Sequence, residues 1–533
     1  MVSLGLEKPV QERERRLVGW LKLFIFIAAS IFLSKGFFVS LVMGEYYRKI
    51  AGENSIRRSS VSAQRGVIVD KNSKMLAGNI KIDGREVRFY PEGEVTATVT
   101  GYLGEIGKEE LDRCQQEGRS CEVGSLIGKD GLEKWYEGRL SGTSGAKLIE
   151  HDASGKILRE IITKSAVPGE QVKLNLDLTL QRVAYNSLKE GLKENGKSGV
   201  VVVSQVNGEV LALVSLPSYD PNLFTSDNRG VEGGDYAERQ DILNDNQNRP
   251  LFNRAVSGVF APGSVYKLVP AIAGLSDGTI NSKTMIVDEG EIVVGEYRFG
   301  NWYYDQYGGK EGEIGVERAI ARSNDIFFYK LGEMLGVDIL VSWSKRLGLG
   351  SKTGIDLPAE AEGLVPSPVW REKEKGERWF LGNTYHMSIG QGDLLTTPIQ
   401  INRTTAAVVS GRLCKPRIWQ GEKKKEGVCE DLEISKEDRN IVIEGMKQAC
   451  SPGGTAFPLF EFAGSIACKT GTAQHGSEIH IPHAWISVVI PKDTYEDDES
   501  LVITVLVEEG GEGSKVAAPI AKRIVEFLES IEQ

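Results

Sequence analysis

The chain has 533 residues, of which 41% are hydrophobic and 26% charged, and these proportions exclude a disordered or collagen-like protein. Its 64 basic and 74 acidic residues give a net charge of −10, which excludes a nucleic-acid binder that works through a general basic surface. At about 150 residues per domain, the length allows three or four domains with a large buried core.

An apolar segment near the N-terminus predicts a membrane anchor. It runs from Leu17 to Met43, interrupted by Lys22 and Lys35, and a bilayer is spanned by roughly 20 residues. Three arginines lie just before it: Arg13, Arg15 and Arg16. The positive-inside rule therefore predicts a cytoplasmic tail (1–16), an anchor (17–43) and an extracytoplasmic remainder.

Two details of this anchor have alternative interpretations. A cleaved signal peptide is the alternative to the anchor, but apolar sequence resumes directly after Gly36, as in a stop-transfer segment. Lys35 would be costly near the bilayer centre. Either the span ends at Ser34 and Lys35 lies among the outer headgroups, or Lys35 faces a partner helix.

Residues 44–165 are polar and rich in turns, without a catalytic cluster or a long helical period, so we predict a supporting pedestal domain. The six cysteines of the chain form three pairs of near neighbours: Cys114 and Cys121, Cys414 and Cys429, Cys450 and Cys468. Outside the membrane such pairs favour disulfides, with buried free thiols as the alternative. The absence of a C-x-x-C pair excludes a zinc ribbon.

The remainder, residues 166–533, predicts an α+β domain. Gly199–Ser215 contains two β-rich runs joined by Asn207-Gly208, a strong hairpin signal. Further strands are predicted near the C-terminus at Ile466–Thr472, Ala484–Ile490 and Leu501–Val507, followed by a helix over Val516–Ile531. The middle, from Ser264 to about Gly454, is largely helical and loop sequence. We therefore expect an antiparallel sheet built from both ends of the domain, with a helical insert between them.

Ser264-Val265-Tyr266-Lys267 follows Pro262-Gly263, an arrangement that starts a helix at the serine. Residues three apart on a helix are neighbours, so Lys267 is predicted to lie over the Ser264 hydroxyl. A partly desolvated lysine can take the proton of such a serine and make it a nucleophile.

The order of the motifs selects among several copies. Serine acyl transferases carry S-x-x-K first, a serine-plus-polar motif second and K-T-G last, on a strand. Ser264, Ser323-Asn324-Asp325 and Lys469-Thr470-Gly471 follow this order. The remaining copies do not, and we interpret them as surface or turn sequence: Ser342-Trp343-Ser344-Lys345, Lys352-Thr353-Gly354 and Ser226-Asp227-Asn228.

These motifs, in their surroundings, resemble a monofunctional (class B) penicillin-binding protein of the elongation type, and the resemblance covers nearly the whole chain. The segments that carry it are Phe260–Lys267, Ser323–Tyr329, Gly390-Gln391-Gly392 with Thr397-Pro398, and Lys469–Ala473, with Arg65-Gly66, Asp70, Gly131-Leu132-Glu133 and Tyr136 in the pedestal. Asp325, where many relatives have Asn, and His483-Ala484-Trp485 are similar to the elongation branch.

The resemblance implies a transpeptidase fold and a role for each motif residue. Ser264 would attack the D-Ala-D-Ala carbonyl of a peptidoglycan stem peptide, Lys267 would be the general base, and Ser323 would relay a proton to the leaving amine. Lys469 would bind the substrate carboxylate, with Asp325, Thr470, Gly471 and Thr472 as further substrate contacts. The backbone N–H groups of Ser264 and Thr472 would form the oxyanion hole.

The implied partners are peptidoglycan stem peptides, β-lactams and a membrane glycosyltransferase of the shape/division family, because the pedestal lacks a second catalytic cluster. No cofactor is implied. A D,D-carboxypeptidase or β-lactamase, which gives the acyl group to water, and a non-catalytic wall-synthesis scaffold remain as alternatives.

We predict no metal site. Some elongation-type relatives bind zinc between the first two motifs, but this chain has no His or Cys from Val265 to Asp325. A second possibility lies after the third motif, where four residues have a spacing that could place metal ligands in one loop: His475, Glu478, His480 and His483. We favour the alternative of a polar loop between two strands.

Overall fold

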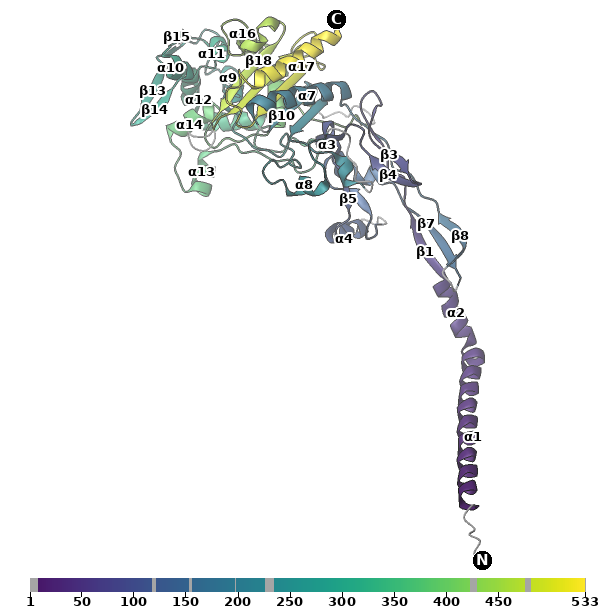
Figure 1. Cartoon of the computed structure of the whole chain (residues 1–533). Helices are drawn as coiled ribbons and strands as arrows, with labels where there is room; N and C mark the ends of the chain where they lie inside the picture. The colour runs from purple at the N-terminus through teal and green to yellow at the C-terminus, as the bar shows by residue number, and fades with distance from the viewer. Residues whose placement is uncertain are drawn as a thin grey trace, which may run out of the picture. The chain divides into compact units, whose positions relative to one another are not determined.

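The computed structural model describes residues 8–116, 121–152, 156–196, 198–225, 234–421, 429–474 and 481–532. The chain divides into two compact units, Met1–Ala63 with Thr143–Val167, and Gln64–Gly142 with Pro168–Gln533. Figure 1 labels many of the elements of both units. The domain boundaries expected from the sequence remain predictions.

The first unit begins with the long helix α1 (Lys8–Phe37), a π-helical turn (Phe38–Val42) and helix α2 (Gly44–Ser55). The stretch Arg13–Val42 is long and apolar enough to cross a membrane and is not buried within the protein. This agrees with the predicted anchor. Three antiparallel strands complete the unit in the order β1 (Ile56–Val61), β7 (Gly145–His151) and β8 (Ile157–Lys164).

The second unit starts with two small sheets and four short helices. The first sheet has the order β4 (Arg85–Phe89), β3 (Met75–Ile82), β2 (Ile68–Val69), β9 (Val172–Lys173), and the second pairs β5 (Leu103–Glu105) with β6 (Leu126–Gly128). The helices are α3 (Ala97–Thr100), α4 (Lys108–Gln116), α5 (Gly131–Trp135) and α6 (Glu137–Leu140). Glu133 of α5 is fully buried and forms ion pairs with Arg65 at 2.6 Å and with Arg88 of β4 at 2.7 Å.

A five-stranded antiparallel sheet forms the centre of the second unit. Its strands, in spatial order, are β11 (Val210–Leu216), β10 (Gly199–Gln205), β20 (Leu501–Val507), β19 (His483–Ile490) and β18 (Ala467–Ala473). The predicted hairpin is confirmed, with Gly199 opposite Leu216, and so are the three predicted C-terminal strands. The sheet is therefore built from both ends of the domain.

Alternate residues of these strands pack against helices on opposite faces. Val201 and Val203 of β10 lie in one core with helices α7 (Leu178–Asn195) and α17 (Ala517–Glu532), which run together over the sheet in Figure 1. Val200 and Val202 instead lie in a core that includes residues of α15 (Pro398–Ser410). This two-residue alternation is the normal pattern of a strand covered on both faces.

The segment between β11 and β18 is the predicted helical insert, and the predicted α+β fold is confirmed. Its remaining helices are α8 (Arg239–Asn244), α9 (Leu268–Ser276), α10 (Trp302–Tyr307), α11 (Val316–Arg322), α12 (Asp325–Arg346), α13 (Pro368–Lys375), α14 (Leu381–Ser388) and α16 (Lys436–Ala449). Its short strands pair as β12 (Ile286–Asp288) with β15 (Gly312–Ile314), β13 (Glu291–Val294) with β14 (Tyr297–Gly300), and β16 (Arg412–Cys414) with β17 (Cys429–Asp431).

All six cysteines are paired with their near neighbours, as the disulfide interpretation predicted. Cys114 bonds to Cys121, Cys414 to Cys429 and Cys450 to Cys468. The third bond joins the end of α16 to strand β18, directly before Lys469.

Candidate active site

The S-x-x-K segment forms a tight turn that packs against strand β18. A 3₁₀ turn spans Gly263–Lys267 and continues into α9. Gly263 has φ +55°, and a Cβ at this position would lie 2.8 Å from the Thr472 carbonyl oxygen. Two hydrogen bonds hold the turn, from the Gly263 N–H to the Gly390 carbonyl (2.8 Å) and from the Trp485 indole to the Ala261 carbonyl (3.1 Å).

Ser264 and Lys267 lie on the same side of this turn but differ in their exposure to solvent. Residues three apart are eclipsed in a 3₁₀ helix. Ser264 is partly exposed, whereas Lys267 is completely buried. Burial lowers the pKa of Lys267, because a charged amine loses its hydration inside the protein, and the Asp325 carboxylate opposes this shift. A buried amine of this kind is suited to accept a proton from an adjacent hydroxyl.

The hydrogen bonds of the Lys267 amine go to the second motif. It donates to the Ser323 carbonyl (2.8 Å), the Ser323 hydroxyl (3.3 Å) and Asp325 Oδ1 (2.7 Å). These three acceptors match the three N–H bonds of an ammonium group. The structure therefore brings the first and second motifs together, and Asp325, expected as a substrate contact, forms an ion pair with Lys267.

Ser323 occupies a backbone conformation that few residues other than glycine adopt. Its φ of 52° and ψ of 40° lie in the left-handed region, between the end of α11 and the start of α12. For a serine this conformation costs on the order of 1 kcal/mol or more. The turn leaves the Ser323 carbonyl and hydroxyl both facing Lys267, while Asn324 caps α12 by accepting the N–H of Phe327.

The third motif lies on β18, beside the serine turn. Lys469 is completely buried and donates to the Thr470 carbonyl at 2.9 Å. Burial lowers the pKa of Lys469 well below its usual value, and the nearby charge of Lys267 lowers it further, while Asp325 opposes the shift. A Cβ on Gly471 would lie 3.1 Å from Val265, so the glycine lets the strand and the serine turn approach closely.

Two hydroxyl groups of the third motif lie at different depths. Thr470 is buried, and its hydroxyl shares a hydrogen bond with that of Thr455 at 2.7 Å. Thr472 is exposed and accepts the N–H of Gly513 at 3.3 Å. Thr472 therefore presents an exposed side chain on β18, which is an edge strand of the sheet.

The other copies of the motifs lie elsewhere. Ser342 and Lys345 are exposed on α12, and only Ser344 of that segment touches the site indirectly, through a 2.7 Å hydrogen bond with the Tyr266 hydroxyl. Lys352 is exposed, and Thr353 donates to Glu360. Ser226-Asp227-Asn228 lies outside the described residues.

The expectation that the chain has no metal site remains a prediction. Three of the four loop residues, His475, Glu478 and His480, lie outside the described residues, while His483 on β19 accepts the N–H of Glu509 at 3.1 Å. Between the first two motifs, the oxygens of buried Asp288 accept hydrogen bonds from N–H groups alone.

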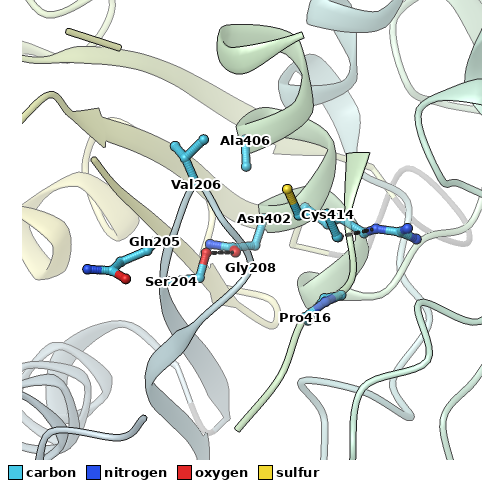
Figure 2. Close-up of a pocket in the computed structure, with 9 residues that line it drawn as sticks. Ser204, Gln205, Val206, Gly208, Asn402, Ala406, Cys414 and Pro416 are labelled. Atoms are coloured by element: carbon cyan, nitrogen blue, oxygen red, sulfur yellow. Dashed lines mark hydrogen bonds between the residues drawn. The ribbon is translucent and has the colours of Figure 1, made fainter. Parts of the chain in front are cut away.

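A small hollow lies away from these motifs, between the end of β10, helix α15 and the disulfide-bonded strand β16 (Figure 2). Its volume of about 10 Å³ has room for about one water molecule. Ser204 donates to Asn402 across it at 2.6 Å. It contains none of the predicted site residues and has no room for a substrate.

Comparison with known proteins agrees with this geometry. A family model described as the penicillin binding protein transpeptidase domain matches residues 198–526, and one for the penicillin-binding protein dimerisation domain matches residues 79–174. The chain belongs to the penicillin-binding protein transpeptidase family. The resemblance to this family that the sequence motifs indicated is confirmed.

Individual relatives extend the match over most of the chain. Peptidoglycan D,D-transpeptidase MrdA of Acinetobacter baumannii is 34% identical over 84% of this chain and 67% of its own length. The structure of Pseudomonas aeruginosa PBP2 in complex with WCK 5153 is 32% identical, with a TM-score of 0.74, and covers 89% of this chain and 96% of that one. A chain of a peptidoglycan synthase complex described as coordinating polymerization and crosslinking is 27% identical, with a TM-score of 0.75. The match covers 95% of this chain and 97% of that one.

Sequence reasoning missed three residues around the second motif. The Trp302 N–H donates to Asp325 Oδ2 at 3.0 Å, Asn301 accepts the Asp325 N–H at 3.2 Å, and Asp288 binds the side chains of both Asn301 and Asn324. Asp288 ends β12, Asn301 precedes α10 and Trp302 begins it, and no shared motif or spacing distinguishes the three from their neighbours.

Proposed function

We propose that this chain is a peptidoglycan D,D-transpeptidase of the elongation type that cross-links stem peptides through an acyl-enzyme on Ser264. The observation that carries the proposal is the position of the Lys267 amine. It is buried, follows Ser264 by one 3₁₀ turn and is bonded to Ser323 and Asp325. This arrangement supplies a base and a proton relay next to a partly exposed serine.

In the first half-reaction the Ser264 Oγ attacks the carbonyl carbon of the penultimate D-Ala. Its proton passes to Lys267, and through Ser323 to the nitrogen of the terminal D-Ala. The new O–C bond replaces the broken C–N bond, and free D-Ala leaves. Backbone N–H groups of Ser264 and Thr472 stabilise the tetrahedral oxyanion, a contribution of a few kcal/mol for each donor.

Lys469, Thr470, Gly471 and Thr472 would bind the terminal carboxylate of the donor peptide. The lowered pKa of Lys469 fits a site that waits for an anion, because an arriving carboxylate stabilises the protonated amine and replaces the hydration that burial removed. Asp325 keeps the neighbouring Lys267 amine in place. A β-lactam would acylate the same serine by opening its ring.

In the second half-reaction, the amine of another stem peptide attacks the ester carbonyl. It forms the cross-link and releases Ser264, which recovers its proton from the amine through Ser323 and Lys267. Transfer to water would make the protein a carboxypeptidase or β-lactamase. The match to the dimerisation domain in addition to the transpeptidase domain favours transfer to an amine.

The apolar helix α1 would anchor the protein in the cytoplasmic membrane, with Arg13, Arg15 and Arg16 on the inner side and the transpeptidase domain outside. Glycan polymerisation would then come from a membrane glycosyltransferase of the shape/division family. The similarity to a chain of a complex that coordinates polymerization and crosslinking supports this partner.

Mass spectrometry of the protein after incubation with a penicillin tests the proposal. One adduct on the Ser264 peptide, absent in Ser264→Ala and retained in Ser342→Ala, is the expected result. Labelling at Ser342, or no adduct on folded protein, would contradict it and favour the scaffold. A stem-peptide donor, offered an amine acceptor, then distinguishes a cross-linked product from a hydrolysed one.

A further inference from the structure

Asp288 lies at the centre of a buried hydrogen-bond network beside the second motif. It ends strand β12, is 1% exposed, and accepts four hydrogen bonds. Its Oδ1 accepts the Gly290 N–H at 2.7 Å, and its Oδ2 accepts the Asn324 amide at 2.6 Å, the Asn301 amide at 2.8 Å and the Glu311 N–H at 3.2 Å. Three of the four bonds therefore converge on Oδ2, and one goes to Oδ1.

The carboxylate determines which way the two asparagine side chains point. Because each amide nitrogen faces Asp288, each amide oxygen must face the other way. The Asn324 oxygen accepts the Phe327 N–H at 2.8 Å, in the first turn of α12, and the Asn301 oxygen accepts the Asp325 N–H at 3.2 Å. An Asn in place of Asp288 would lack the negative charge that strengthens these bonds. It has a single acceptor oxygen, so its N–H₂ group would face either the Gly290 N–H or the donors at Oδ2.

The network reaches the candidate active site in one further step. Asn301 is followed by Trp302, whose N–H donates to Asp325 Oδ2 at 3.0 Å, and Asp325 Oδ1 pairs with Lys267 at 2.7 Å. Asn324 lies between Ser323 and Asp325, so the Asp288–Asn324 bond holds the turn that gives Ser323 its positive φ. Ser323 and Asp325, which both bind the Lys267 amine, are thus linked through neighbouring residues to the buried carboxylate of Asp288.

We propose that Asp288 is a positioning residue for acylation: it holds Ser323 and Asp325 against Lys267 through the amides of Asn324 and Asn301. The inference rests on the function proposed above and adds a residue outside the three motifs. Loss of the network would displace the second motif without removing any group that touches substrate. A displacement of about 1 Å can slow an enzyme by roughly 100-fold.

Asp356 offers a matched control. It is also a buried carboxylate with donors alone as partners, the N–H groups of Ile418 (2.7 Å) and Trp419 (2.7 Å) and the Tyr136 hydroxyl (2.9 Å). None of these partners belongs to the motifs. Asp288→Asn and Asp356→Asn therefore remove the same chemical group from similar surroundings, at the site and away from it.

The test measures the rate of acylation by a fluorescent penicillin across a range of pH, together with the melting temperature. We expect both variants to lower the melting temperature by a few degrees. Asp288→Asn should acylate about 10- to 100-fold more slowly, whereas Asp356→Asn should stay within about twofold of the unchanged protein. The acid limb of the rate should also move to lower pH in Asp288→Asn alone, since a displaced Asp325 raises the pKa of Lys267 less.

Equal acylation rates and unmoved pH profiles in the two variants would overturn the proposal. Absence of acylation in the unchanged protein would instead contradict the proposed function, so the two failures are distinguishable. If Asp288→Asn does not fold, Asn324→Ser gives a second test, because serine still caps α12 but cannot replace the amide donor to Asp288. Acylation of folded Asn324→Ser at the unchanged rate would likewise overturn the inference.

Discussion

The amine of Lys267 and the carboxylate of Asp325 form an ion pair at 2.7 Å that joins the first and second motifs across 58 residues of sequence. Burial lowers the pKa of both Lys267 and Lys469, and the Asp325 carboxylate opposes this shift in each of them. One carboxylate thus influences the protonation of two buried lysines, and this shared influence makes the pH dependence of acylation a sensitive measure of the site.

We expect Asp325→Asn to move both limbs of the acylation profile to lower pH. The rate should rise with pH as Lys267 loses its proton and becomes a base, and fall again as Lys469 loses the charge that binds substrate. Without the Asp325 charge, the pKa of each lysine falls, so each limb moves down. The measurement is the acylation rate against pH, whose limbs belong to the coupled pair. An upward shift of either limb would contradict the electrostatic account.

Lys469→Ala and Ser323→Ala should separate binding from chemistry. Loss of a charge-assisted hydrogen bond to the substrate carboxylate is worth about 1.5–3 kcal/mol, or roughly 10- to 100-fold in affinity. Lys469→Ala should weaken non-covalent binding by this factor, whereas Ser323→Ala should mainly slow acylation. Rapid-mixing kinetics separate the two steps. Lys352→Ala, in the other K-T-G sequence, is the control.

A penicillin methyl ester sharpens that comparison, because it lacks the negative charge. Lys469→Ala and the unchanged protein should therefore bind the ester with similar affinity. Comparable binding losses in Lys469→Ala and Ser323→Ala for the charged penicillin would show that the division of roles is wrong.

The Cys450–Cys468 disulfide should affect both stability and acylation. It closes a separation of 18 residues and the Cys414–Cys429 bond closes 15, so removing either should cost about 3 kcal/mol of unfolding free energy. Cys468 directly precedes Lys469 on β18, whereas Cys414 and Cys429 lie on β16 and β17. We therefore expect the double alanine variant at 450 and 468 to acylate more slowly than the one at 414 and 429. Denaturant unfolding and acylation rates provide the measurement, and equal rates would exclude a role in positioning Lys469.

Gly263 and Gly278 form a pair that separates backbone strain from steric contact. Both have positive φ, +55° and +74°, but a Cβ on Gly263 would lie 2.8 Å from the Thr472 carbonyl, whereas one on Gly278 has nothing within 4 Å. Alanine at either position should cost about 1 kcal/mol of stability. Only Gly263→Ala should slow acylation, because it pushes the serine turn away from β18. Similar acylation by both variants would count against that close packing.

The sheet and the motifs could be predicted from the sequence because their signals are local. Residues 199–216 combine β-branched runs with Asn207-Gly208, and the hairpin forms where this pattern places it. The order of Ser264, Ser323 and Lys469 likewise selected the copies that the fold brings together.

The partners of Lys267 could not be predicted in the same way. Helical spacing indicated that its amine lies over Ser264, but its hydrogen bonds go to Ser323 and Asp325, because the left-handed turn at Ser323 directs both its carbonyl and its hydroxyl inward. The role of Asp288 depends on contacts with Asn301 and Asn324, 13 and 36 residues away. Such contacts exist only after the insert has folded.

The strand order of the central sheet also determines when this domain can fold. The last strand, β20, lies in the middle, between β10 and β19. Until Leu501–Val507 has been synthesised, the N-terminal hairpin and the β18–β19 pair that carries Lys469 have no connection within the sheet. Contacts this distant in sequence form slowly, so the sheet of a nascent chain would remain incomplete nearly to the end of synthesis. Any truncation before residue 501 would remove the sheet's centre rather than its edge.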